Sequence, residues 1–181
     1  MTVLNLILPI LISTIVLFFA SFLSWMVLQL HKKDWRKLRN EDEFIAAVRQ
    51  CEIQQGTYMF PMAESPAEMK NEEFKRKFEA GPRGIITVFG DMNMPTNLVL
   101  TIIYFFVVSF MLAYLSKIAL KPGAPFLDVF RFVSTAGLMT FLSAIVQHAI
   151  WFRTRIVGHV IESIAYAILT GLIFAAMWPK S

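Results

Sequence analysis

The chain has 181 residues, of which 56% are hydrophobic, 14% aromatic and 17% charged. Soluble domains have about 45–50% apolar and about 25% charged residues, so this composition indicates a membrane protein. The high aromatic content excludes a disordered chain, and the single cysteine excludes a disulfide-stabilised scaffold.

The charges are concentrated in one segment. Of 17 basic and 13 acidic residues, 11 of each lie between His31 and Asn97, so the net charge of +4 belongs to the remaining, apolar part of the chain. A pI near 9.3 raises the possibility of nucleic-acid binding. That function needs a basic face on a folded domain, whereas the polar segment has equal numbers of basic and acidic residues. We therefore expect membrane lipids, and no nucleic acid, among the partners.

Four apolar runs are long enough to cross a bilayer, which takes about 20 helical residues. We predict spans at about 3–30, 97–116, 126–152 and 156–178. The first run is uncharged, contains Pro9 as a candidate kink, and is too long for a cleaved signal peptide. The predicted organisation is a first transmembrane helix (1–30), an insertion (31–96) and three further transmembrane helices (97–181).

Basic residues follow the first span immediately, and none precedes it. They are Lys32, Lys33, Arg36, Lys37 and Arg39. Basic flanks stay cytoplasmic and contact lipid headgroups, so we predict an outside N-terminus and a cytoplasmic segment 31–96. The turn at 153–155 is then also cytoplasmic, and His31, within the basic flank, is interpreted as another headgroup contact.

The insertion has the pattern of a small α+β unit. Asn40 and Glu43 resemble a capping box, and Ser65 before Pro66 predicts the start of a second helix that ends at Gly81. The β-prone runs 57–60 and 85–89 predict two strands that pair. The predicted fold is an all-α membrane protein with four transmembrane helices and this α+β cytoplasmic insertion between the first and second spans.

Several short motifs carry a resemblance. They are Trp25-Met-Val-Leu-Gln-Leu-His31, Asn-Glu-Asp-Glu-Phe-Ile-Ala-Ala-Val-Arg at 40–49, Gly56-Thr-Tyr-Met-Phe-Pro61, and Gly81-Pro82 before a strand. Together they resemble an uncharacterised family of small bacterial inner-membrane proteins, although Gln29 stands where that pattern has proline. The resemblance implies a multi-pass protein of the bacterial inner (plasma) membrane and supplies no functional residue.

Ionisable residues inside spans are costly, so they are the default functional candidates. Asp128 and Arg131, at i and i+3 of the third span, are predicted to form an intramembrane ion pair. His148 precedes the 153–155 turn, and His159 and Glu162 follow it, so a helical hairpin brings all three to a similar depth.

These three residues are candidate metal ligands, because imidazole and carboxylate groups commonly bind metal ions. The same cluster is compatible with proton relay, with holding a quinone or haem, or with a purely structural polar cluster that bonds Arg153, Arg155 or water. The sequence names no particular cofactor.

Small residues recur every fourth position in the last span: Ser163, Ala167, Gly171 and Ala175. They predict a helix-packing face, either within the chain or against another protein. Phosphate-binding loops and the G-x-S-x-G motif are absent, which favours a non-enzymatic role. We predict an accessory or assembly subunit that packs on a larger membrane complex or forms a homo-oligomer. The alternatives are a small transporter or channel, and a membrane protein that binds a metal or cofactor.

Overall fold

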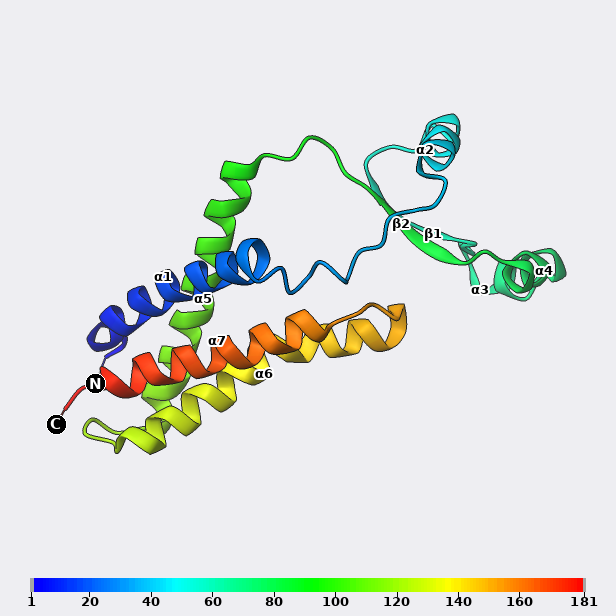
Figure 1. Cartoon of the computed structure of the whole chain (residues 1–181). Helices are drawn as coiled ribbons and strands as arrows, with labels where there is room; N and C mark the ends of the chain where they lie inside the picture. The colour runs from blue at the N-terminus through cyan, green and yellow to red at the C-terminus, as the bar shows by residue number, and fades with distance from the viewer. Residues whose placement is uncertain (1, 181) are drawn as a thin grey trace. The chain divides into compact units, whose positions relative to one another are not determined.

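The computed structural model describes residues 2–180, which form two compact units (Figure 1). The helical unit contains the residues up to Arg36 and those from Met94 onward, and the insertion unit is Lys37–Asn93. The helical unit contains every helix that is long and apolar enough to span a bilayer. It also contains the candidate site described below.

Four helical segments of the described chain are long and apolar enough to cross a membrane, as the sequence predicts. They are Val3–Val27, α5 (Met94–Ala119), α6 (Phe126–Phe152) and α7 (Val157–Ala176). The first consists of a 3₁₀ turn η1 (Val3–Leu6), α1 (Ile7–Phe22) and a π-helical turn η2 (Leu23–Val27). Pro9 lies in the first turn of α1, where the N–H that proline lacks would have no helical partner.

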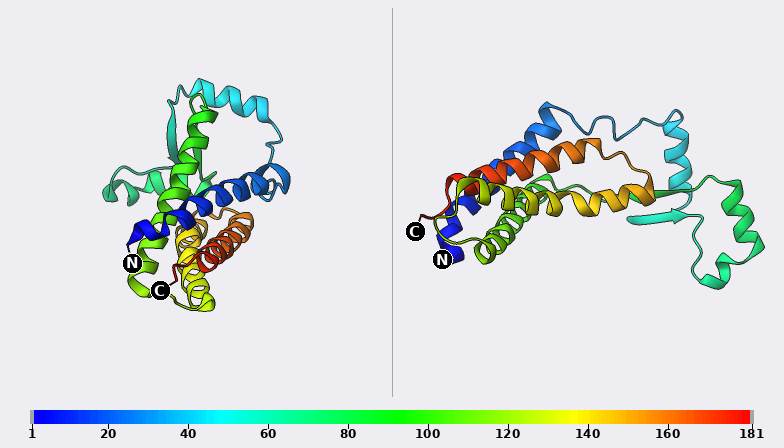
Figure 2. Two further views of the ribbon diagram at one scale, coloured as in Figure 1. Left: turned by 90° about the vertical axis from the view of Figure 1, so that its left-hand side faces the viewer. Right: turned by 90° about the horizontal axis from the view of Figure 1, so that it is seen from below.

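Helices α6 and α7 form an antiparallel hairpin along most of their length, and α1 packs against both α5 and α7 (Figure 2). The small residues of α7 explain the close approach. A Cβ added at Gly137 of α6 would lie 3.5 Å from the Cα of Ala167. A Cβ added at Gly171 would collide with the Ser134 hydroxyl and lie 3.1 Å from the Phe130 ring. The small-residue face of α7 therefore packs against α6 of the same chain.

The core of the helical unit consists of two apolar clusters. One joins Leu6 and Ile10 near the start of the chain to Phe174 and Trp178 near its end. The Trp178 indole Nε1 donates to the Lys121 carbonyl at 2.9 Å, which closes this end of the unit against the α5–α6 turn. The second cluster, with Leu17, Phe105, Leu112, Phe141 and Tyr166 among its members, lies further along the helices.

The insertion unit contains three helices and one hairpin. Its elements are α2 (Glu41–Gln50), β1 (Gly56–Phe60), α3 (Pro66–Met69), α4 (Glu72–Ala80) and β2 (Gly84–Val88). The two strands pair antiparallel, with Gly56 opposite Val88 and Phe60 opposite Gly84, so the predicted pairing is confirmed. No residue between positions 37 and 93 is fully buried, since two strands and three short helices cannot enclose a core.

The helix caps of the insertion agree with the sequence only in part. Ser65 caps α3 as predicted, because its Oγ accepts from the Glu68 N–H at 3.2 Å. The predicted helix then divides, since Asn71 accepts from the Glu73 N–H at 2.8 Å and starts α4 anew. At α2 the predicted capping box is not formed, because the Asn40 side chain instead donates to the Glu43 carboxylate.

Candidate metal site

A sharp turn after η2 brings His31 back toward α7. The Leu30 N–H donates to the Ser24 carbonyl at 3.1 Å and ends the helical winding. Gln29 adopts a left-handed backbone with φ of 48°, a conformation that residues other than glycine seldom take. Beyond this turn His31 is only 3% exposed. Its interpretation as a headgroup contact is therefore wrong, and the reason is this change of chain direction.

The first turn of α7 makes room for the imidazole. A Cβ added at Gly158 would lie 2.8 Å from His31 Cε1 and 3.1 Å from the Leu30 carbonyl oxygen. Real Cβ atoms do not approach neighbours at the shorter of these distances. Glycine at this position therefore lets His31 pack directly on the backbone of α7.

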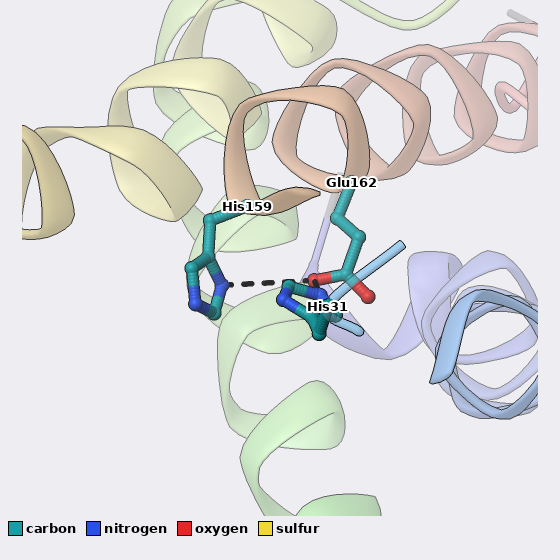
Figure 3. A group of neighbouring side chains, drawn as sticks. All are labelled: His31, His159 and Glu162. Atoms are coloured by element: carbon teal, nitrogen blue, oxygen red, sulfur yellow. Dashed lines mark ion pairs between the residues drawn. The ribbon is translucent and has the colours of Figure 1, made fainter. Parts of the chain in front are cut away.

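His31, His159 and Glu162 converge at this end of the helical unit (Figure 3). Each offers one ligand atom, and these atoms all lie within 4.8 Å of one another. His31 Nε2 is 3.1 Å from Glu162 Oε2, and His159 Nδ1 is 3.8 Å from the same oxygen. The Glu162 side chain is 8% exposed and that of His159 is 34% exposed, so the group is buried on one side and accessible on the other.

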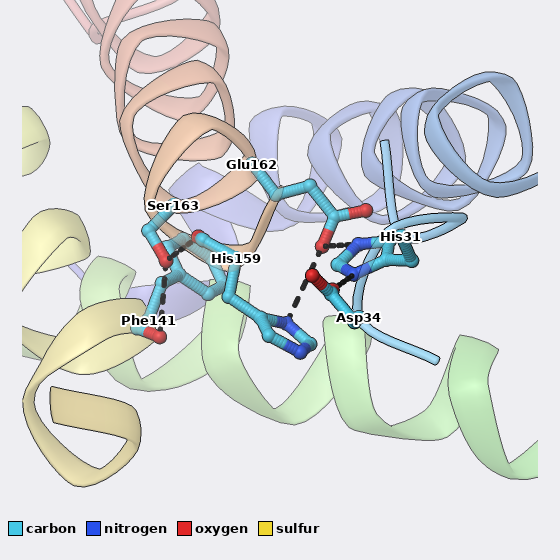
Figure 4. Close-up of polar contacts among 6 residues, drawn as sticks. All are labelled: His31, Asp34, Phe141, His159, Glu162 and Ser163. Atoms are coloured by element: carbon cyan, nitrogen blue, oxygen red, sulfur yellow. Dashed lines mark hydrogen bonds and ion pairs between the residues drawn. The ribbon is translucent and has the colours of Figure 1, made fainter. Parts of the chain in front are cut away.

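Asp34 fixes the orientation of the His31 ring. Its Oδ2 lies 2.8 Å from His31 Nδ1, and because a carboxylate only accepts, Nδ1 donates this hydrogen bond (Figure 4). Arg155 Nε, 3.6 Å from Asp34 Oδ1, supplies the compensating charge. The opposite ring nitrogen, Nε2, thus points toward Glu162. Among residues 2–180, neither this Nε2 nor Glu162 Oε1 has a hydrogen-bond partner, although both are buried.

Aromatic and hydroxyl contacts hold the surrounding structure. The Trp25 indole stacks on the His31 ring, with centroids 4.0 Å apart and planes inclined by 17°. The His31 and His159 rings are 4.4 Å apart. Ser163 Oγ lies 2.7 Å from the His159 carbonyl and 3.2 Å from the Phe141 carbonyl, which fixes the start of α7 against α6 (Figure 4).

The structure groups the candidate residues differently from the sequence. His159 and Glu162 lie together, but the third member of the group within the described chain is His31 rather than His148. His148 is exposed, and its ring is tilted by 40° against that of Phe152, one turn along α6, with centroids 4.5 Å apart. It lines the same cavity as His31 and His159 without belonging to the close cluster.

The predicted Asp128–Arg131 ion pair is not formed among the described residues 2–180. Both side chains are exposed near the start of α6. Asp128 lies in the first helical turn, where the helix dipole favours a carboxylate without a cationic partner. The basic residues predicted to flank the first span are all exposed, as headgroup contacts require: Lys32, Lys33, Arg36, Lys37 and Arg39.

Four apolar helices and a buried polar cluster at their end fit a multi-pass membrane protein. The chain matches no model of a known protein family, and no curated protein or solved structure is similar to it.

Proposed function

We propose that this protein is a metal-binding membrane protein that holds one divalent transition-metal ion through His31, His159 and Glu162. The observation that carries this proposal is the convergence of two imidazole nitrogens on one oxygen of the buried Glu162 carboxylate, with the three ligand atoms all within 4.8 Å of one another. Because Nδ1 of His31 donates to Asp34, its Nε2 offers a lone pair toward the Glu162 carboxylate 3.1 Å away. A neutral imidazole nitrogen and a carboxylate oxygen at this distance repel each other unless a proton or a metal ion lies between them, and the second imidazole beside the same oxygen favours the metal ion.

The ligand set favours a zinc-type ion over magnesium or calcium. Imidazole binds zinc, iron, nickel and copper, whereas magnesium and calcium prefer oxygen ligands alone. Ligands about 2.0 Å from a tetrahedral zinc lie about 3.3 Å from one another, so the three side chains need only small shifts to bind one ion. Two histidines and one carboxylate leave a coordination position open, as in sites that exchange a ligand or a substrate.

Asp34 completes the site as an orienting group. A carboxylate that accepts the second N–H of a ligating histidine fixes the tautomer and makes the ligand nitrogen more basic. The Asp34–His31 hydrogen bond has this geometry, and Arg155 places a positive charge beside Asp34 without bringing a cation to the ligand atoms.

The proposal is tested by titrating the purified full chain, in detergent and free of any histidine tag, with Co²⁺ after treatment with EDTA. We expect one equivalent to bind with the visible spectrum of a nitrogen–oxygen site. His31→Ala should weaken binding at least about 100-fold, since loss of a ligand exceeds the 10–100-fold cost of losing an orienting group. His148→Ala, the matched control on α6, should bind like the parent. No binding by the parent chain, or equal binding by His31→Ala, would refute the site.

The accessory-subunit role predicted from the sequence receives less support. The small-residue face that was a candidate surface for another protein is buried against α6. A bound ion at the end of the bundle is compatible with a role in metal transfer, and the open coordination position favours that role over a structural one. Localisation to a bacterial inner membrane rests on the resemblance and on the basic flank.

The proposed orientation, with the insertion in the cytoplasm, is tested through Cys51. This cysteine is the only one in the sequence, lies in the insertion unit and is exposed. A membrane-impermeant maleimide should leave it unmodified in intact cells and label it after lysis. A Cys51→Ser chain with a new cysteine at the exposed Pro122, in the α5–α6 turn, should be labelled in intact cells. Labelling of Cys51 without lysis would invert the topology.

A further inference from the structure

A cavity of about 970 Å³ opens beside the metal-site cluster, within the helical unit. Its walls come from the segment after η2, from the end of α6 and from the turn that leads into α7. Ligand pockets in proteins measure about 300–1,000 Å³, so this cavity is large enough for a small molecule or a lipid headgroup.

The charge of the cavity is predominantly positive. Lys33, Arg36, Arg153 and Arg155 line it, and Asp34 is the only acidic residue among its described lining residues. Arg155 is matched by Asp34 at 3.6 Å. Within residues 2–180, the other three cations form no ion pair. Three uncompensated positive charges around one cavity favour an anionic occupant.

Much of the remaining wall is apolar or aromatic. Trp25, Trp35, Ala144, Ile145 and Ile156 line the cavity together with the basic residues. An inorganic anion would gain nothing from these walls, whereas an amphiphile would bury its apolar part against them. Indole side chains are also typical of the headgroup level of a membrane, where apolar and polar surfaces meet.

Arg153 occupies an unusual backbone position. It ends α6 with φ of 51° and ψ of 32°, the left-handed position that glycine most often takes at the end of a helix. A residue with a side chain is strained there, and such strain recurs at functional sites. Its guanidinium group matches the oxygen geometry of a phosphate by two parallel hydrogen bonds.

We infer that this cavity binds the phosphate headgroup of an anionic membrane lipid, held by Arg36, Lys33 and Arg153, with the adjoining apolar part of the lipid against the tryptophan and aliphatic walls. Basic pockets at the ends of transmembrane helices bind anionic lipid headgroups by the same chemistry. The inference does not depend on a metal ion, because none of these three cations belongs to the proposed ligand set.

The test measures binding of dioctanoyl phosphatidic acid to the purified full chain in neutral detergent, with EDTA present so that metal plays no part. Dioctanoyl phosphatidylcholine and inorganic phosphate are the comparison ligands. We expect phosphatidic acid to bind at least about tenfold more tightly than either comparison ligand. Phosphatidylcholine lacks the net negative charge of the headgroup, and inorganic phosphate lacks the apolar part.

The variant Arg36→Gln/Arg153→Gln should bind phosphatidic acid at least about tenfold more weakly, while the control Lys121→Gln/Arg131→Gln, outside the cavity, should bind like the parent. A separate measurement shows that the Arg36→Gln/Arg153→Gln variant folds. It should bind Co²⁺ like the parent or, if the parent binds no Co²⁺, unfold at the parental temperature. Equal binding by both variants, or equal affinity for phosphatidylcholine, would overturn the inference. Inorganic phosphate binding as tightly as the lipid would assign the cavity to the free anion and overturn the lipid assignment.

Discussion

Glu162→Gln should abolish metal binding while leaving the yield of folded protein unchanged. The amide has nearly the same shape as the carboxylate, so packing at the start of α7 is preserved. It lacks the negative charge that makes Glu162 a ligand, and we expect Co²⁺ or Zn²⁺ affinity to fall at least about 100-fold. The measurement is a titration of both chains in the same detergent, combined with their thermal unfolding without metal.

Thermal unfolding separates a ligand role from a structural one. A buried carboxylate without a cation is costly, so the metal-free Glu162→Gln chain should be at least as stable as the metal-free parent. Added Zn²⁺ should raise the unfolding temperature of the parent alone, since a ligand that binds only the folded state stabilises it. Asp128→Asn, which removes an exposed carboxylate from α6, is the matched control and should respond to Zn²⁺ like the parent. If Glu162→Gln also gained stability from Zn²⁺, this carboxylate would not be a ligand.

Gly171→Leu should separate α7 from α6 and reduce the amount of folded protein. Even a Cβ at this position would collide with Ser134 and crowd Phe130, and a leucine side chain is larger still. Overpacking of this kind costs about 1–3 kcal/mol, and more where backbones are in contact. The readouts are the yield of monodisperse protein and its unfolding temperature.

Ile168→Leu provides the control for this substitution. Ile168 lies on the same helix and is 43% exposed, so an isomeric side chain there should change neither yield nor unfolding temperature. Equal behaviour of the two variants would mean that the close contact between α6 and α7 contributes little to stability.

Patterns local in sequence predicted much of the fold. Long, predominantly apolar runs allowed the four long helices to be recognised. The β-prone runs around Thr57 and Ile86 predicted the hairpin, and Ser65 before Pro66 predicted a capped helix start. Each of these features depends on residues that are close together in the sequence, so each could be predicted from the sequence alone.

The site depends on contacts that sequence spacing does not encode. His159 and Glu162 were recognisable because residues at i and i+3 share a helix face. The distance of His148 from the 153–155 turn predicts its position along α6 but not the direction in which its side chain points. That side chain is exposed. His31 enters the group because the backbone reverses at Gln29, a residue with no special preference for the left-handed conformation.

Asp34 was missed although a signal for it was present. It is the only acid among nine residues, 31–39, that contain five basic side chains, and it follows His31 by three positions. A lone carboxylate three residues after a histidine has the spacing of a local hydrogen bond, and the structure contains that bond. Within this exposed basic segment, His31 is buried and Asp34 is only 10% exposed, because the two side chains bond to each other against α7.

The stacking of Trp25 on His31 gives the protein an internal optical reporter. Indole fluorescence responds to the polarity and charge of whatever touches the ring face, and here that neighbour is a proposed ligand 4.0 Å away. The sequence contains three other tryptophans, so a chain that keeps Trp25 alone would emit from this one position. Its emission would follow changes at His31 in real time, in detergent or in vesicles, without any added dye.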